Sequence, residues 1–152
     1  MKELRNIYIE PTEKTPQVDF NYFTGNLILA GRSIPENATE IYKPVQNWVS
    51  EYIKNARQTT NLRLNLEYFN TASSIWLAKI VKSLSKIENP DYIMFVHLYF
   101  NIEEFDILDV EDIKDALNHV VDIVNTSTIS IGVKIYGTDD KGGIVKESMV
   151  LI

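Results

Sequence analysis

The sequence contains no cysteine among its 152 residues, so disulfide bonds and thiolate metal ligands are excluded. It also has no apolar run long enough to cross a bilayer, and residues 1–6 contain no apolar signal segment. Basic residues are few: 15 Lys and Arg stand against 21 Asp and Glu, for a net charge of −6. We therefore expect a cytoplasmic protein for which nucleic acid and anionic membranes are poor partners.

The remaining composition is that of an ordinary globular protein. Apolar residues make up 45% of the chain and charged residues 24%, and we find neither an internal repeat nor an interdomain linker. The length predicts a single domain over residues 1–152, large enough to bury a core without covalent cross-links.

The first third of the chain predicts strands followed by a helix. Residues 7–9 form a short strand, and residues 18–22 and 26–30 flank a Thr24–Gly25 turn that is typical of a β-hairpin. An amphipathic helix then runs to about Arg57, because apolar residues recur at three- and four-residue steps. Proline costs roughly 3 kcal/mol inside a helix. We therefore expect Pro44 in the first turn of the main helix, preceded by a short separate turn.

The rest of the chain alternates between strand and helix patterns. The predicted elements, in order, are a strand over 62–69, a helical stripe over 76–87, an apolar strand over 92–100, a helical stripe over 113–124, a strand over 129–135, a turn over 137–143 and a returning strand over 144–152. This order predicts an α/β fold with a single mixed β-sheet covered by helices. It has an opening hairpin, right-handed βαβ crossovers and a C-terminal helix and hairpin.

Nothing in the sequence argues for an enzyme. The two histidines are His97, in the middle of a predicted strand, and His119, on the polar side of the third helical stripe. A satisfied sheet-face histidine is the better interpretation of His97, because no nucleophile is marked beside it. No nucleotide-binding glycine motif occurs. We predict no catalytic, metal-binding or cofactor-binding residue.

The acidic segments also favour structural roles. Residues 103–112 lack the spacing and the glycine turn of a calcium loop, so a solvated loop in which Asp109 caps the next helix is the better interpretation. Asp139 and Asp140 fall in a predicted hairpin turn, where aspartate hydrogen-bonds to its own backbone.

The most informative segment is Asn70-Thr71-Ala72-Ser73-Ser74, at the junction of a predicted strand and helix. The first turn of a helix collects unpaired N–H groups and favours negative charge. One side chain suffices as an N-cap, yet this junction offers four polar ones. The junction is therefore either a helix cap or a site where an added phosphate, of about −1.5 to −2 charges, would be tolerated.

A second polar loop covers residues 32–37. Asn37 with Glu40 three residues later resembles a capping box. Arg32 is either an exposed solvated side chain or a partner contact, since arginine is a frequent interface anchor.

Three stretches of this chain resemble the SiaC family of bacterial regulatory phosphoproteins. They match in order and spacing, and they are residues 12–20, residues 31–38 with Tyr42, Pro44 and Trp48, and residues 66–74. The resemblance implies a fold like that of STAS-type anti-sigma-factor antagonists. It also implies phosphorylation of Thr71, with Ser73 and Ser74 as alternates.

The resemblance further implies a partner-switching adaptor. Its expected partners are an anti-sigma-type serine/threonine kinase, a PPM-type phosphatase that resets it and a diguanylate cyclase that it controls. The predicted partner-binding residues are Arg32, Ser33, Asn37, Tyr68 and Asn70.

The sequence departs from the family in two places. Ala72 stands where the family usually has serine, and the chain after about residue 105 does not follow the short acidic ending of the family. We therefore predict a family-like part over residues 1–105 and a divergent extension over residues 106–152.

The alternative function is a small-molecule-sensing domain of STAS-like fold without phosphoregulation. Its pocket would be lined by the aromatic residues Tyr8, Phe20, Tyr22, Phe23, Tyr68 and Phe69.

Overall fold

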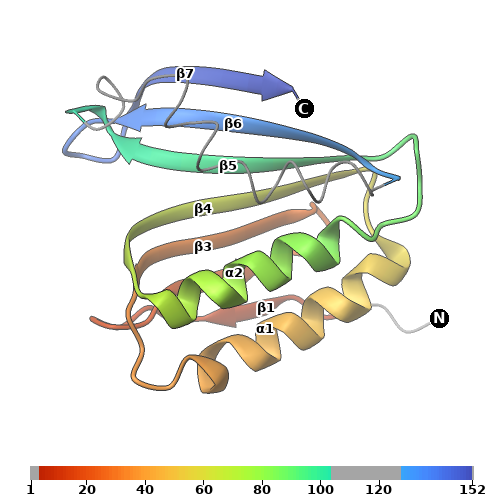
Figure 1. Cartoon of the computed structure of the whole chain (residues 1–152), viewed down its shortest axis with the longest axis horizontal. Coiled ribbons are helices and arrows are strands. Elements are labelled where there is room, and N and C mark those ends of the chain that lie inside the picture. The colour runs from red at the N-terminus through yellow and green to blue at the C-terminus, as the bar shows by residue number, and fades with distance from the viewer. Residues whose placement is uncertain (1–3, 104–127, 152) are drawn as a thin grey trace.

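The computed structural model describes residues 4–103 and 128–151. In this part of the chain, seven strands form one sheet in which the spatial order follows the chain order (Figure 1). The strands are β1 (Ile7–Ile9), β2 (Gln17–Phe20), β3 (Asn26–Ser33), β4 (Thr59–Phe69), β5 (Ile93–Asn101), β6 (Ser130–Thr138) and β7 (Ile144–Leu151). The helices are α1 (Ala38–Tyr52), the short 3-10 helix η1 (Ile53–Asn55) and α2 (Thr71–Leu84).

The sheet is mixed, as predicted. Strands β1, β2 and β3 pair antiparallel, β3 to β6 pair parallel, and β7 returns antiparallel to β6. These pairings confirm the opening hairpin, the βαβ crossovers and the C-terminal hairpin. The third helical stripe over 113–124 lies outside the described residues.

Both described helices cover the same face of the sheet (Figure 1). Right-handed crossovers that advance across a sheet in one direction always place their helices on one side. The apolar stripes of α1 and α2 pack there against inward-facing strand residues. Fully buried members of this core include Phe20, Leu29, Tyr42, Leu62 and Ile80.

The expected position of Pro44 was wrong. Helix α1 is continuous from Ala38 to Tyr52 and carries Pro44 in its interior. Pro44 lies on the exposed side, so water can replace the hydrogen bond that its missing N–H leaves unmade. The opposite side buries six residues, and this packing outweighs the local cost of the proline.

The parallel strands diverge at their carboxyl ends. Pairing of β4 with β5 ends at Leu64 and Leu98, whereas β3–β4 pairing continues to Ser33 and Phe69. The β3–β4 register shifts between Gly31 and Arg32, and such bulges increase the local twist of a strand. The sheet therefore splits at this edge into a β1–β4 part and a β5–β7 part (Figure 1).

Within residues 4–103 and 128–151, no helix is long and apolar enough to cross a membrane.

Candidate functional site

The N-terminus of α2 is built on Asn70. Its side-chain oxygen accepts a hydrogen bond from the Ser73 backbone N–H at 2.9 Å, which makes Asn70 the N-cap. Its side-chain amide donates to the Pro35 carbonyl at 3.2 Å, and its backbone N–H donates to the Ser33 carbonyl at 3.0 Å. Asn70 therefore joins the loop after β3 to the loop after β4. The two loops are neighbours because the paired parallel strands end at the same end of the sheet.

Ser73 belongs to the interior. It is fully buried, and its hydroxyl donates to the Ser33 carbonyl at 2.8 Å. The Ser33 hydroxyl donates to Ser73 Oγ at 2.8 Å and also hydrogen-bonds to the Tyr42 hydroxyl. Burial raises the pKa of Tyr42 above its ordinary value of 10.0, so this network stays neutral.

Thr71 differs from the two serines that follow it. It is exposed, and its hydroxyl makes no hydrogen bond within the described part of the chain. Ser74 is half-buried, and its hydroxyl donates to the Thr71 carbonyl at 2.7 Å. The first turn of α2 also carries no acidic residue. Thr71 is thus the hydroxyl of this junction that a modifying enzyme can reach most easily.

Apolar side chains flank Thr71 on the surface. Phe69 is 56% exposed, Ile75 one helical turn later is 54% exposed, and Ile34 is 38% exposed. The residue before Ile34, Ser33, pairs with Phe69 in the sheet. We call Ile34, Phe69 and Ile75 the apolar patch. Exposed clusters of this kind often mark protein interaction sites.

Arg32 contacts two residues near the end of β4. Its guanidinium lies 3.6 Å from the Glu67 carboxylate and 5.5 Å from the centre of the Tyr68 ring. Arg32 and Tyr68 are both exposed, so this ion pair and ring contact lie at the surface. The predicted contact residues Arg32 and Tyr68 are therefore adjacent.

The other two predicted partner-binding residues in this loop, Asn37 and Ser33, have structural roles. Asn37 caps α1 by accepting from the Glu40 backbone N–H at 3.4 Å, and it remains exposed. Ser33 is fully buried within the hydroxyl network. A buried side chain has no surface to offer a partner, so we do not retain Ser33 among the proposed contact residues.

Replacing Ser73 with alanine should destabilise the protein by about 2 kcal/mol, because it leaves the buried Ser33 carbonyl and hydroxyl with fewer partners. Urea unfolding at neutral pH measures the change. Ser74→Ala, which removes a partly solvated hydrogen bond, is the control and should cost less than about 1 kcal/mol. Equal effects of the two substitutions would contradict the structural role of Ser73.

His97 is a satisfied sheet-face histidine, as predicted, and it lies on the face opposite the helices. Its Nδ1 is 2.7 Å from the Tyr136 hydroxyl and its Nε2 is 2.8 Å from the Asn61 side-chain oxygen. The side-chain oxygen of Asn61 can only accept, so Nε2 donates and Nδ1 accepts. Burial, together with the positive charges of Arg63 and Lys134, lowers the pKa of His97 from 6.5 to about 4. The nearly continuous apolar sequence of β5 predicts that other elements pack on both faces of this strand. Among the described helices, none packs on the face that carries His97.

Four of the six aromatic residues of the alternative function lie in three different places within the described structure. Phe20 is part of the buried core, and Tyr22 lines a cavity of about 510 Å³ beside Trp48. Tyr68 and Phe69 line a separate cleft of about 860 Å³ between the diverging strands. This cleft was missed by the sequence analysis, because the point where two strands stop pairing leaves no local pattern.

Some residues considered in the sequence analysis lie outside the described part of the chain. His119 and the proposed Asp109 cap lie outside the described residues, as does most of the acidic segment 103–112. Asp139 does bond to its own turn, because its carboxylate accepts from the backbone N–H groups of Lys141 at 2.9 Å and Gly143 at 2.8 Å.

One family model matches most of the chain. The model of the family described as SiaC family regulatory phosphoprotein matches residues 9–126, which extends beyond residue 105. A relative from Pseudomonas aeruginosa (strain UCBPP-PA14), described as an uncharacterized protein, is 31% identical over 70 residues. That alignment spans 46% of this chain and 56% of the relative.

Solved structures share the fold. The crystal structure of apo-SiaC from P. aeruginosa has a TM-score of 0.62 at 19% identity, covering 85% of this chain and 98% of that chain. SiaC in the complex with the diguanylate cyclase SiaD, of which it is the activator, has a TM-score of 0.64 at 19% identity. That match covers 86% of this chain and 99% of the other.

Proposed function

Because the chain belongs to the SiaC family of regulatory phosphoproteins, we propose that it is an adaptor whose affinity for a protein partner is controlled by phosphorylation of Thr71. The observation that carries this proposal is the exposed Thr71 hydroxyl, without a hydrogen bond in the described part of the chain, at the N-terminus of α2. Ser73 is a poorer acceptor because it is buried and hydrogen-bonded. The regulatory character of the family supports a role in protein binding rather than catalysis.

The fold is suited to carry a phosphate at this position. The positive end of the α2 dipole and the unpaired N–H groups of its first turn favour an added dianion. No acidic residue of that turn opposes it. The phosphate therefore changes the surface without requiring the helix to unfold.

The same phosphate should weaken the binding of a partner that docks on the apolar patch. Burying a dianion without a matching cation costs several kcal/mol. Phe69 and Ile75, which flank Thr71, are each more than half exposed and would be covered by such a partner. We therefore propose that the unmodified protein binds and the phosphorylated protein is released.

The proposed enzymes of this switch are those that the sequence resemblance implies. We propose an anti-sigma-type kinase as the source of the phosphate and a PPM-type phosphatase that removes it. We propose a diguanylate cyclase as the regulated partner, because the SiaC of similar fold is in complex with the cyclase SiaD as its activator.

Intact-mass and peptide mass spectrometry tests the proposed site. Incubation with the kinase and ATP should add a single phosphate, located on Thr71, and Thr71→Val should accept none. The thermal stability of Thr71→Val should match that of the wild type, because the replaced hydroxyl has no hydrogen bond in the described structure. Phosphate on Ser74 in the wild-type protein would overturn the assignment to Thr71.

Arg32→Ala should weaken partner binding by roughly 1–2 kcal/mol, as arginine anchors in interfaces commonly do. The change should leave folding intact, since the Arg32–Glu67 pair is exposed and contributes little to stability. Titration calorimetry measures the affinity, and Lys54→Ala, which removes an exposed ion pair with Glu51, is the control. Unchanged affinity in Arg32→Ala would place this side chain outside the interface.

A further inference from the structure

Within the described part of the chain, the diverging strands leave an unpaired sheet edge beside Thr71. Strand β4 continues to Phe69, but its pairing with β5 stops at Leu64. Its other side remains paired with β3, so the segment over 65–69 is held as a strand with one open edge. Such an edge can accept a further extended chain by main-chain hydrogen bonding.

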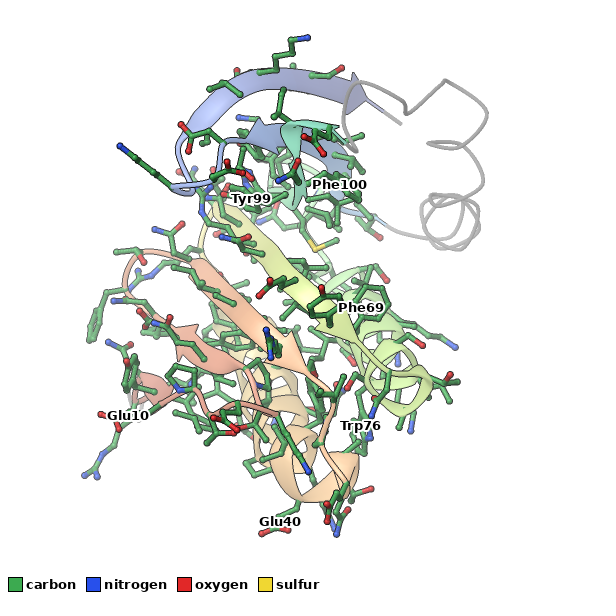
Figure 2. The ribbon with its side chains drawn as sticks, turned by 90° about the vertical axis from the view of Figure 1, so that its left-hand side faces the viewer. Glu10, Glu40, Phe69, Trp76, Tyr99 and Phe100 are labelled. Atoms are coloured by element: carbon green, nitrogen blue, oxygen red, sulfur yellow. The ribbon has the colours of Figure 1, made fainter. Side chains whose placement is uncertain are left out.

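A cleft of about 860 Å³ lies along this open edge. Tyr68 and Phe69 line it from β4, and Tyr99 and Phe100 line it from β5. Figure 2 looks onto the end of the sheet where the parallel strands stop, with Phe69 below and Tyr99 and Phe100 above. The Tyr99 hydroxyl accepts a hydrogen bond from Arg63 at 2.9 Å, so one wall is fixed to β4 at the point where the strands separate.

The rim of the cleft is acidic. Glu103 lies two residues after the end of β5, and Asp139 and Asp140 lie in the β6–β7 turn. No lysine or arginine is among the described residues that line the cleft. Glu67, on β4, also lines the cleft but is paired with Arg32. Asp139 already accepts backbone hydrogen bonds, so Glu103 and Asp140 are the carboxylates most available to a ligand.

We propose that this cleft receives an extended, basic segment of the partner protein, which adds to the open edge of β4. The apolar walls fit the alternate side chains of an extended peptide, and the carboxylates select basic residues. This inference rests on the proposed function, because it names the part of the partner that docks next to Thr71. Thr71 comes directly after β4 and the α2 N-cap Asn70, so a phosphate on Thr71 would lie at the end of this interface.

Amide chemical shifts of the whole chain test the cleft with a defined probe. A short synthetic peptide of alternating lysine and valine should produce saturable shifts at Gly31, at residues 65–69 and at residues 99–101. A matched peptide of alternating glutamate and valine should produce none. N-methylation of the basic peptide backbone should remove the shifts, because it blocks strand addition. Shifts elsewhere, or equal shifts with the acidic peptide, would overturn the proposal.

Charge reversal supplies a second readout. The pair Glu103→Lys with Asp140→Lys should weaken binding of the basic peptide at least ten-fold. The pair Glu88→Lys with Asp91→Lys changes the net charge equally but lies near the opposite end of the sheet, and it should have no effect. Equal losses in both pairs would show a general charge effect and reject the cleft.

The peptide experiment is independent of phosphorylation. It uses the unmodified protein and needs no kinase, so a failed phosphorylation assay leaves the cleft result unchanged. Conversely, absence of peptide binding with normal phosphorylation of Thr71 would reject the cleft and leave the switch in place.

Discussion

Phosphorylation of Thr71 should lower the affinity for the protein partner by at least about 100-fold, or roughly 2.7 kcal/mol. The expected loss follows from placing a dianion between Phe69 and Ile75, whose exposed apolar surfaces a docked partner would remove from water. Titration calorimetry with phosphorylated and unmodified protein measures it. Thr71→Glu carries one charge instead of two and should produce a smaller loss of about ten-fold.

Two controls separate this mechanism from a general effect of charge or folding. Ser50→Glu adds the same charge to an exposed position late in α1, and it should leave partner affinity unchanged. Thr71→Glu should keep the wild-type circular dichroism spectrum, since a negative charge is tolerated at a helix N-terminus. Tighter binding of the phosphorylated form would reverse the direction of the switch, and cooperative loss of structure would favour an order–disorder mechanism.

Acid should destabilise the protein through His97. The pKa of this side chain falls from 6.5 to about 4 on folding, because burial and the nearby Arg63 and Lys134 disfavour the protonated ring. Between these two pKa values the unfolded chain binds the proton more strongly than the folded chain, so stability falls as the pH falls. The loss should be about 2 kcal/mol between pH 7 and pH 5 and about 3 kcal/mol by pH 4.

Protonation is costly here because the existing hydrogen bonds require a neutral ring. Nδ1 lies 2.7 Å from the Tyr136 hydroxyl and 3.4 Å from Arg63, which can only donate. Urea unfolding at a series of pH values compares the wild type with His97→Gln, which carries no proton that titrates in this range. The variant should lack this part of the pH dependence even though its stability at neutral pH is lower. Identical pH profiles for the two proteins would show that His97 does not cause the acid sensitivity.

The elements of this fold are largely determined by local sequence. Period-two alternation over 62–69, the apolar stripes of both described helices and the Asp139 turn each depend on neighbouring residues, so these predictions were confirmed. Pro44 was misplaced for the converse reason. Its local penalty is real, but burial of the opposite side of α1 against the sheet outweighs it.

By itself, the sequence determined that a cluster of hydroxyls stands where β4 passes into α2, and it predicts that a negative charge would be tolerated there. Only the tertiary structure decided which hydroxyl is free. Ser73 is occupied because Ser33, forty residues earlier in the chain, meets it through the parallel pairing of β3 and β4. Ser33 is hidden by the same contact, and Thr71 remains at the surface. The cleft beside it has the same origin, since the place where two strands stop pairing depends on the twist of the whole sheet rather than on any local pattern.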